Sequence, residues 1–112
     1  KQLYDYLKKL KDNKCNISAY GASGKGQSLL QICNIGSNFL DNIYDKSKLK
    51  QGKYTPGTHL KIIDPKYIKE KKIDYLLLLS WNLAKEISKQ EKSFLKNDGK
   101  IIVPFPTPRE FK

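Results

Sequence analysis

The segment DYLLLLSW, residues 74–81, constrains the fold of this chain more than any other. Its apolar residues follow one another without polar residues between them, so a strand built from them must be covered on both faces. A parallel sheet with helices on both sides provides this cover, whereas a sheet with one face in water shows alternating polar residues. The segment therefore predicts a central strand of a parallel sheet.

Segments with helical spacing alternate with short apolar segments along the rest of the chain. Leu3, Leu7 and Leu10 share one face of an opening helix. Pro65 suits the first turn of a later helix, and Asn82 suits an N-cap position. We expect helices over residues 1–14, 27–33, 65–72 and 82–98, and strands over residues 15–21, 39–45, 59–63, 74–81 and 100–105.

Turn-forming residues mark the ends of these elements. Gly36 and Gly99 follow two of the predicted helices and are expected to end them. Residues 46–58 are too rich in glycine and proline for a regular helix, which predicts an ordered loop. The proline-rich tail PFPTPREF is expected to be extended.

This alternation predicts an α/β fold, a Rossmann-like three-layer αβα sandwich with a mostly parallel sheet of about five strands in the order 3-2-1-4-5. In such a sheet a ligand crevice opens where the strand order reverses. Here the crevice lies beyond Gly21 and the segment 80–82. We expect residues 1–112 to form a single domain, and the absence of methionine and the helical start indicate a piece of a longer protein.

The loop YGASGKGQS joins the first predicted strand to the next helix. Amides at a helix start favour an anion, glycines let the backbone approach it, and Lys25 adds a positive charge. The spacing G-x-x-G-x-G matches neither the dinucleotide motif nor the phosphate-binding loop. Two interpretations remain open, a phosphate cradle or a tight turn with close helix packing. Asp45 likewise suits either a ribose hydroxyl or a turn.

No catalytic group is predicted in the crevice. His59, the only histidine, is expected at the sheet edge opposite the crevice, in a structural role. Trp81 either stacks on a ring or fills the core. Ser80 and Asn82 are better placed for binding, with helix capping as the alternative for Asn82. No histidine or cysteine can be placed beside a serine there, so this segment alone is not expected to catalyse a reaction.

Charge and cysteine content limit the possible partners. The net charge of +11 comes from lysines spread along the chain and a single arginine, which predicts solvated lysine faces rather than a nucleic-acid partner. No apolar run approaches the roughly 20 residues that span a membrane, so no membrane partner is expected. Cys15 and Cys33 have neither zinc nor redox spacing and are expected to be small buried thiols, consistent with a reducing compartment and a cytoplasmic protein.

Four blocks in order, YGASGKGQSLLQICNIG, KQGKYTPGTH, DYLLLLSWNLAKEI and IIVPFPTPRE, resemble the C-terminal domain of the sugar C-methyltransferases. The resemblance covers residues 17–110. It implies that the chain is the Rossmann-like third domain of an S-adenosylmethionine-dependent enzyme that methylates a ring carbon of a nucleotide-linked deoxysugar, commonly on thymidine diphosphate. The chain departs from the family's typical loop, GAxAKGNTLL, at Gly24 and Gln27.

The resemblance also implies where the parts of the reaction lie. S-adenosylmethionine would be bound mainly by an upstream domain of the same chain, zinc by an N-terminal region, and the catalytic base outside this segment. This domain would hold the nucleotide sugar through its diphosphate. The alternatives are a free-standing dinucleotide- or coenzyme-binding regulatory module and a purely structural domain-packing element. The residues expected to bind substrate are Tyr20, Gly21, Ala22, Ser23, Lys25, Gly26, Ser80 and Asn82.

Overall fold

The predicted central strand, β4 (Tyr75–Leu78), lies beside β1 (Ile17–Tyr20) in the middle of a six-stranded sheet. The computed structural model describes residues 2–111 of the chain. The strand order is β3-β2-β1-β4-β5-β6, in which the first five strands are parallel and β6 is antiparallel. The leucines at positions 76–79 are at most 1% exposed, which confirms that this segment is covered on both faces.

The remaining elements alternate along the chain as the sequence predicts. Strand–helix–strand connections place β1, β2 and β4 side by side, so the mostly parallel Rossmann-like sheet is confirmed. The strands are β2 (Leu40–Tyr44), β3 (Ile62–Ile63), β5 (Lys100–Val103) and β6 (Arg109–Glu110). The helices are α1 (Gln2–Asp12), α2 (Gly24–Ile32), α3 (Ala84–Gln90) and α4 (Lys92–Lys96), with 3₁₀ turns η1 (Pro65–Glu70) and η2 (Trp81–Leu83).

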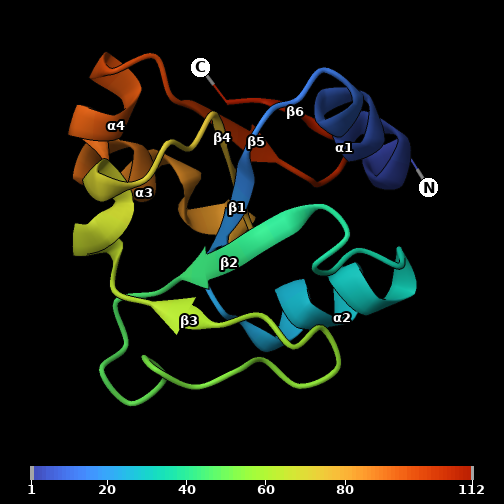
Figure 1. The fold of residues 1–112 in the computed structure, drawn as a ribbon, viewed down its shortest axis with the longest axis horizontal. Coiled ribbons are helices and arrows are strands. Elements are labelled where there is room, and N and C mark those ends of the chain that lie inside the picture. Colours follow the sequence, from blue (N-terminus) through green and yellow to red (C-terminus); the bar gives the residue numbers. More distant parts are fainter. Residues whose placement is uncertain (1, 112) are drawn as a thin grey trace.

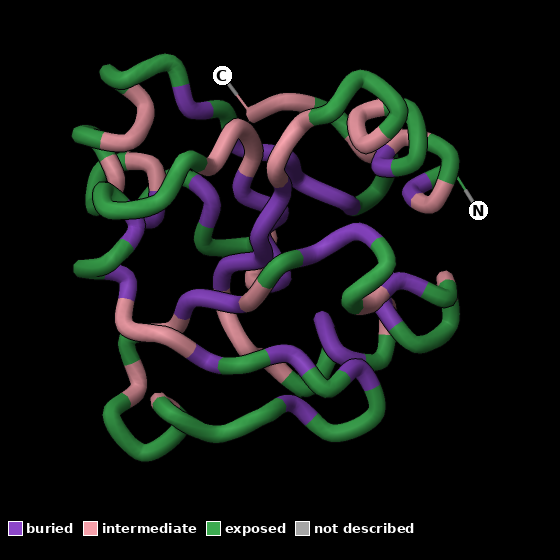
Figure 2. The backbone as a smooth tube through the Cα atoms, viewed as in Figure 1, coloured by how far each residue is buried: buried purple, intermediate pink, exposed green. Residues whose placement is uncertain are grey.

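Helices cover both faces of the sheet (Figure 1). Helices α1 and α2 lie on one side of it, and η1, α3 and α4 lie on the other. Alternate residues of β4 enter the two cores, since Leu77 packs in the cluster with α1 and α2, and Leu76 packs in the cluster with η1 and α3. The buried part of the backbone runs through the middle of the molecule along the strands (Figure 2). The chain's own elements therefore cover both faces of the sheet.

The prediction of one continuous helix over residues 82–98 is wrong. This segment is divided into η2, α3 and α4, and the cap position before α3 is Leu83, which makes no side-chain capping bond. Asn82 lies inside η2 instead of capping a helix. Glu91, with φ −102° and ψ 37°, separates α3 from α4. The change of direction lets Phe94 and Leu95 pack against the sheet.

The strand predicted over residues 59–63 is shorter than expected. Only Ile62 and Ile63 pair with β2, because the preceding residues close a loop in which Tyr54 bridges antiparallel to Lys61. His59 is exposed in this loop with φ 55° and stacks on Tyr54, the ring centroids being 4.9 Å apart.

Two predicted helix ends and the tail also differ. The left-handed residues after the helices are Asn34 (φ 58°) and Asp98 (φ 69°), each ahead of the glycine that was expected to end the helix. Ile35 then donates to the carbonyl of Leu30 at 2.9 Å, so α2 is closed before Gly36. The tail is extended at Arg109–Glu110, as predicted, but it also returns to pair with β5 as β6, which adds a sixth strand beyond the predicted five.

We expect Leu77→Ala to lower the free energy of unfolding by about 2–5 kcal/mol, because its side chain is fully buried in the centre of the sheet. The measurement is urea unfolding followed by circular dichroism. Leu49→Ala is the matched control, since Leu49 is 83% exposed, and its effect should stay within about 0.5 kcal/mol. Equal effects of the two substitutions would contradict this core.

Candidate functional site

The carboxyl ends of β1 and β4 meet at a cavity of about 300 Å³. Its lining comes from the start of α2 and from the residues that follow β4. Because the strand order reverses between β1 and β4, no neighbouring connection covers this point of the sheet edge. Of the predicted binding residues, four line the cavity together. The complete lining is Ser23, Lys25, Leu79, Ser80, Trp81 and Asn82.

Gly21 brings the two strand ends into contact. It has φ +93°, and its amide donates to the carbonyl of Tyr44 at 2.7 Å. A Cβ atom at this position would lie 2.7 Å from the Oγ atom of Ser80. Only glycine combines this backbone conformation with so close an approach. Gly21 therefore determines how near the loop lies to Ser80.

Ser23 and Gly26 fix the start of α2 against the end of β4. The Ser23 hydroxyl accepts from the amide of Gly26 at 3.1 Å as the N-cap and donates to the carbonyl of Leu79 at 3.2 Å. A Cβ atom on Gly26 would lie 2.4 Å from the Cβ atom of Leu79, whereas one on Gly24 would meet nothing within 4 Å. Gly21 and Gly26 thus serve close packing, and Gly24 does not.

Asp45 holds the loop rather than standing free at the strand end. One carboxylate oxygen accepts from the amide of Ala22 at 2.7 Å, and the other accepts from the amide of Ser47 at 2.8 Å. Lys50 donates to the carbonyl of Ala22 at 2.9 Å. Of the two interpretations of Asp45, these contacts support the turn-forming one. Lys50 is a supporting residue that the sequence pattern did not reveal.

Lys25 is the cation of the cavity. It is exposed on the first turn of α2, and it forms no ion pair with any residue in the range 2–111. Amides in the first turn of a helix have no intrahelical acceptor, and here the cap hydroxyl of Ser23 occupies only that of Gly26. Lys25 and the neighbouring amides therefore create a positive region at the cavity.

Tyr20 faces away from the cavity. Its side chain is 4% exposed in the cluster under α3, and its hydroxyl donates to a carboxylate oxygen of Glu91 at 2.8 Å. Burial, reinforced by the hydrogen bond to Glu91, raises the pKa of Tyr20 far above its ordinary value of 10.0. The backbone of Tyr20 supports the crevice through its carbonyl, which accepts from the amide of Leu79 at 2.9 Å. Its contact with a substrate stays a prediction.

Gln27 has a structural role that the sequence did not predict. It is 9% exposed, and its Oε1 atom accepts from the hydroxyl of Thr58 at 2.9 Å. The hydroxyls of Thr58 and Thr55 lie 2.6 Å apart, and Thr55 accepts from the amide of Leu60 at 2.9 Å. This chain of hydrogen bonds anchors residues 55–60 to α2. Gln27, which stands where the family typically has asparagine, therefore supports the loop of residues 55–60 and does not line the cavity.

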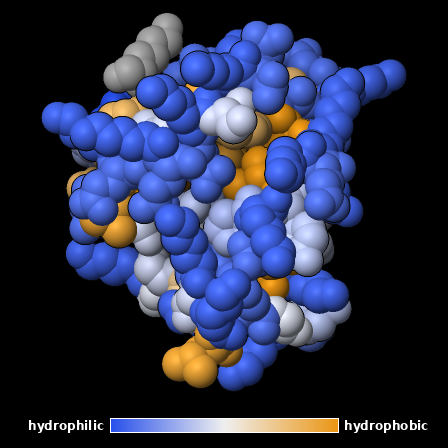
Figure 3. Space-filling model, turned by 90° about the vertical axis from the view of Figure 1, so that its left-hand side faces the viewer, coloured by the Kyte–Doolittle hydropathy of each residue, from blue (hydrophilic) through white to orange (hydrophobic). Residues whose placement is uncertain are grey.

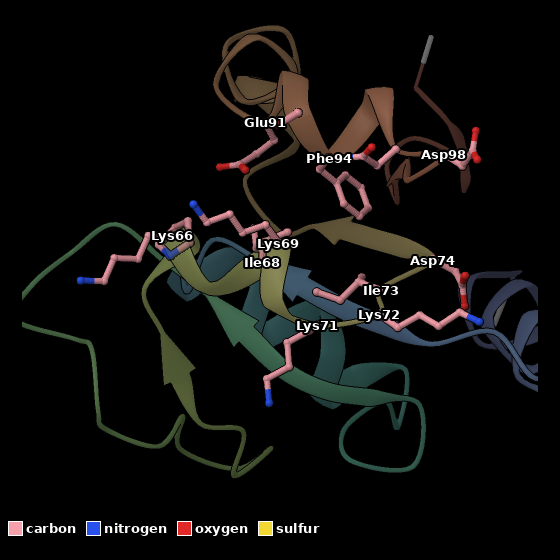
Figure 4. A pocket seen from close by; sticks show the side chains of 13 residues that line it. Lys66, Ile68, Lys69, Lys71, Lys72, Ile73, Asp74, Glu91, Phe94 and Asp98 are labelled. Carbon is pink, nitrogen blue, oxygen red and sulfur yellow. The ribbon is translucent and has the colours of Figure 1, made fainter.

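A larger cavity, of about 650 Å³, lies on the other side of the sheet between η1 and α4. On that face apolar side chains are visible in a hollow between hydrophilic ones (Figure 3). Phe94 points toward Ile73 across the space, while the side chains of Lys66 and Lys71 extend away from it (Figure 4). Its carboxylate Glu91 already accepts from Tyr20. Lysines and the carboxylates of Asp74, Glu91 and Asp98 line this cavity together, whereas the crevice is lined by Lys25 and by no carboxylate.

Within residues 2–111 no three His, Cys, Asp or Glu side chains come together in a way that could hold a metal ion. In the same range no helix has the length and apolar character needed to cross a membrane. Cys15 and Cys33 are both free and partly buried.

Comparisons with known proteins show which proteins this chain resembles. The family model described as C-methyltransferase C-terminal domain matches residues 1–106. C-methyltransferase NovU of Streptomyces niveus is 44% identical over 93 residues, which make up 83% of this chain and 22% of that protein. The chain thus spans less than a quarter of the length of this curated relative.

A solved structure shares the fold. UDP-D-quinovosamine 4-dehydrogenase from Vibrio fischeri matches with a TM-score of 0.60 over 88% of this chain and 93% of that one. The sequence identity is 22%, so the likeness concerns the fold alone.

We expect Gly26→Ala to lower the free energy of unfolding by about 1–3 kcal/mol, because the added methyl group collides with Leu79. Gly24→Ala is the matched control on the same turn. It meets open space without a positive φ, so stability should stay unchanged or rise by up to about 1 kcal/mol. Urea unfolding measures both, and a harmless Gly26→Ala would show that α2 is not held against β4.

We also expect alkaline pH to destabilise the fold through Tyr20. In the unfolded chain Tyr20 loses its proton near the ordinary value of 10.0, whereas the folded chain keeps it bound. Above that pH the unfolded state binds fewer protons than the folded state, so the free energy of unfolding falls as the pH rises. Tyr20→Phe should make the fall in unfolding free energy between about pH 9 and pH 11 shallower. An unchanged slope in Tyr20→Phe would contradict a buried Tyr20 hydroxyl bonded to Glu91.

Proposed function

The chain belongs to the C-methyltransferase C-terminal domain family, and on that premise we propose that it holds a nucleotide-linked sugar for S-adenosylmethionine-dependent C-methylation. The substrate would be a deoxysugar carried on a nucleoside diphosphate such as thymidine diphosphate. S-adenosylmethionine, zinc and the catalytic base are assigned to other segments of a longer protein. The part of the curated relative that aligns with this chain is 22% of that protein, so the relative is long enough to contain such segments.

The observation that carries this proposal is the meeting of Lys25 with Ser80 and Asn82 at one cavity. A diphosphate carries negative charge that Lys25 and the first-turn amides of α2 attract. The hydroxyl of Ser80 and the amide group of Asn82 supply neutral hydrogen-bonding groups on the opposite wall. Lys25 lies on the first turn of α2, and Ser80 and Asn82 follow β4, so the contact of α2 with the end of β4 fixes their separation.

The size of the cavity indicates a partial site. A volume of about 300 Å³ lies at the lower end of the range for ligand pockets, below what a whole nucleotide sugar fills. We therefore propose that the sugar ring extends beyond the crevice toward the upstream domain. The domain would in this way present the ring to the methyl donor.

The chemistry assigns this domain a positioning role. Methylation of a ring carbon requires removal of a proton beside a keto group and attack of the resulting enolate on the sulfonium methyl group. A base must lie within hydrogen-bonding reach of that proton, and no residue of the crevice is a suitable base. Holding the nucleotide end still affects the rate, since a displacement of about 1 Å can cost on the order of a hundredfold.

We expect Lys25→Ala to weaken binding of thymidine diphosphate by about tenfold, through loss of a charge-assisted contact. Amide shifts at residues 21–26, followed by NMR during titration, measure the affinity. Lys96→Ala, an exposed position on α4, removes the same charge far from the crevice and should have little effect. Equal losses in both variants would indicate attraction by the net charge alone.

The same titration with nicotinamide adenine dinucleotide and S-adenosylmethionine tests the alternatives. Tighter binding of the dinucleotide by tenfold or more would contradict the proposed function and favour a coenzyme-binding module. No binding of any of the three would favour a structural domain. In the complete parent protein, deletion of this domain should abolish methyl transfer to the nucleotide sugar.

A further inference from the structure

We infer that Trp81 is the stacking surface for the nucleobase of the bound nucleotide. The inference rests on the proposed function and adds to it a recognition site for the base, separate from the contacts to the phosphates. It assigns a role in binding to Trp81, which lines the crevice, and a supporting role to Phe105, whose ring lies beside it.

Trp81 is placed in the crevice by the end of β4. It is the first residue of η2, directly after Ser80, and it lines the same cavity as Lys25. Trp81 is only partly buried at the border of the core cluster on the α3 side. Part of its indole therefore packs on the protein, and part faces the cavity.

Phe105 supports the indole from the tail that follows β5. The two ring centroids are 5.5 Å apart, and the ring planes are inclined by 31°. Such pairs of aromatic rings stabilise one another, so the orientation of the indole is held before any ligand arrives. Phe105 is itself 57% exposed, which means that the pair lies at the surface instead of filling the core.

The exposed aromatic area matches the shape of a nucleoside diphosphate. Such a ligand has an anionic end and a flat ring, and the cavity offers a lysine on one wall and an indole on another. Bases stack on aromatic side chains with little dependence on their hydrogen-bonding pattern.

The chain offers a clean probe, because Trp81 is its only tryptophan. Fluorescence of the 112-residue chain is recorded during titration with thymidine diphosphate and, separately, with inorganic pyrophosphate, which carries charge but no base. We expect thymidine diphosphate to quench the fluorescence and pyrophosphate to bind without quenching. Amide shifts at residues 21–26 show that pyrophosphate has bound.

Substitutions separate stacking from charge. Trp81→Leu should weaken binding of thymidine diphosphate by about tenfold or more and leave the affinity for pyrophosphate unchanged. Trp81→Phe keeps a ring and should retain most of the affinity, which also guards against a variant that fails to fold. Tyr67→Leu removes an aromatic ring that is 40% exposed on η1, away from the crevice, and should change neither affinity.

The outcomes distinguish this inference from the proposed function. If both ligands bind through Lys25 with similar affinity, and thymidine diphosphate leaves Trp81 unquenched, the stacking role is overturned while the diphosphate site stands. If neither ligand binds, both the diphosphate site and the stacking role are overturned. Quenching by thymidine diphosphate alone, together with a selective loss in Trp81→Leu, supports the stacking role.

Discussion

The close approach of α2 to the end of β4 is the constraint on which the crevice depends. Gly26 allows it because any side chain there would collide with Leu79, and Ser23 holds it by capping the helix and bonding to the same residue. The first turn of α2 then points its amides and Lys25 at the cavity beside Ser80. A wider separation would leave these groups without a common site.

Hydrogen bonds on both faces of the sheet support the backbone around the crevice. On the α2 side, Gln27 and two threonines anchor the loop that follows β2, while Asp45 and Lys50 hold the loop after β1. On the other side, the hydroxyl of Tyr20 is held by Glu91 between α3 and α4. The crevice thus lies on a backbone that is fixed from both sides, although none of these residues lines it.

Patterns local in sequence predicted most of the architecture. The uninterrupted apolar segment 74–81 identified the central strand, and strand–helix alternation gave the order of the five parallel strands. Errors arose where tertiary contacts override local preference. Residues 82–98 have continuous helical spacing, yet the helix breaks at Glu91 and lets Phe94 and Leu95 reach the sheet. The return of the tail as β6 depends on pairing with β5, which tail composition does not encode.

Glycine spacing, apolar runs and strand order are local or topological properties, so the family, the five parallel strands and the two segments that border the crevice could be read from the sequence. Which residues face the cavity depends on the tertiary structure. Tyr20 and Ala22 lie in the predicted loop, but the hydroxyl of one and the backbone groups of the other are engaged by the fold. Side-chain direction at a strand end depends on what packs on each face of the sheet, and that depends on residues distant in sequence.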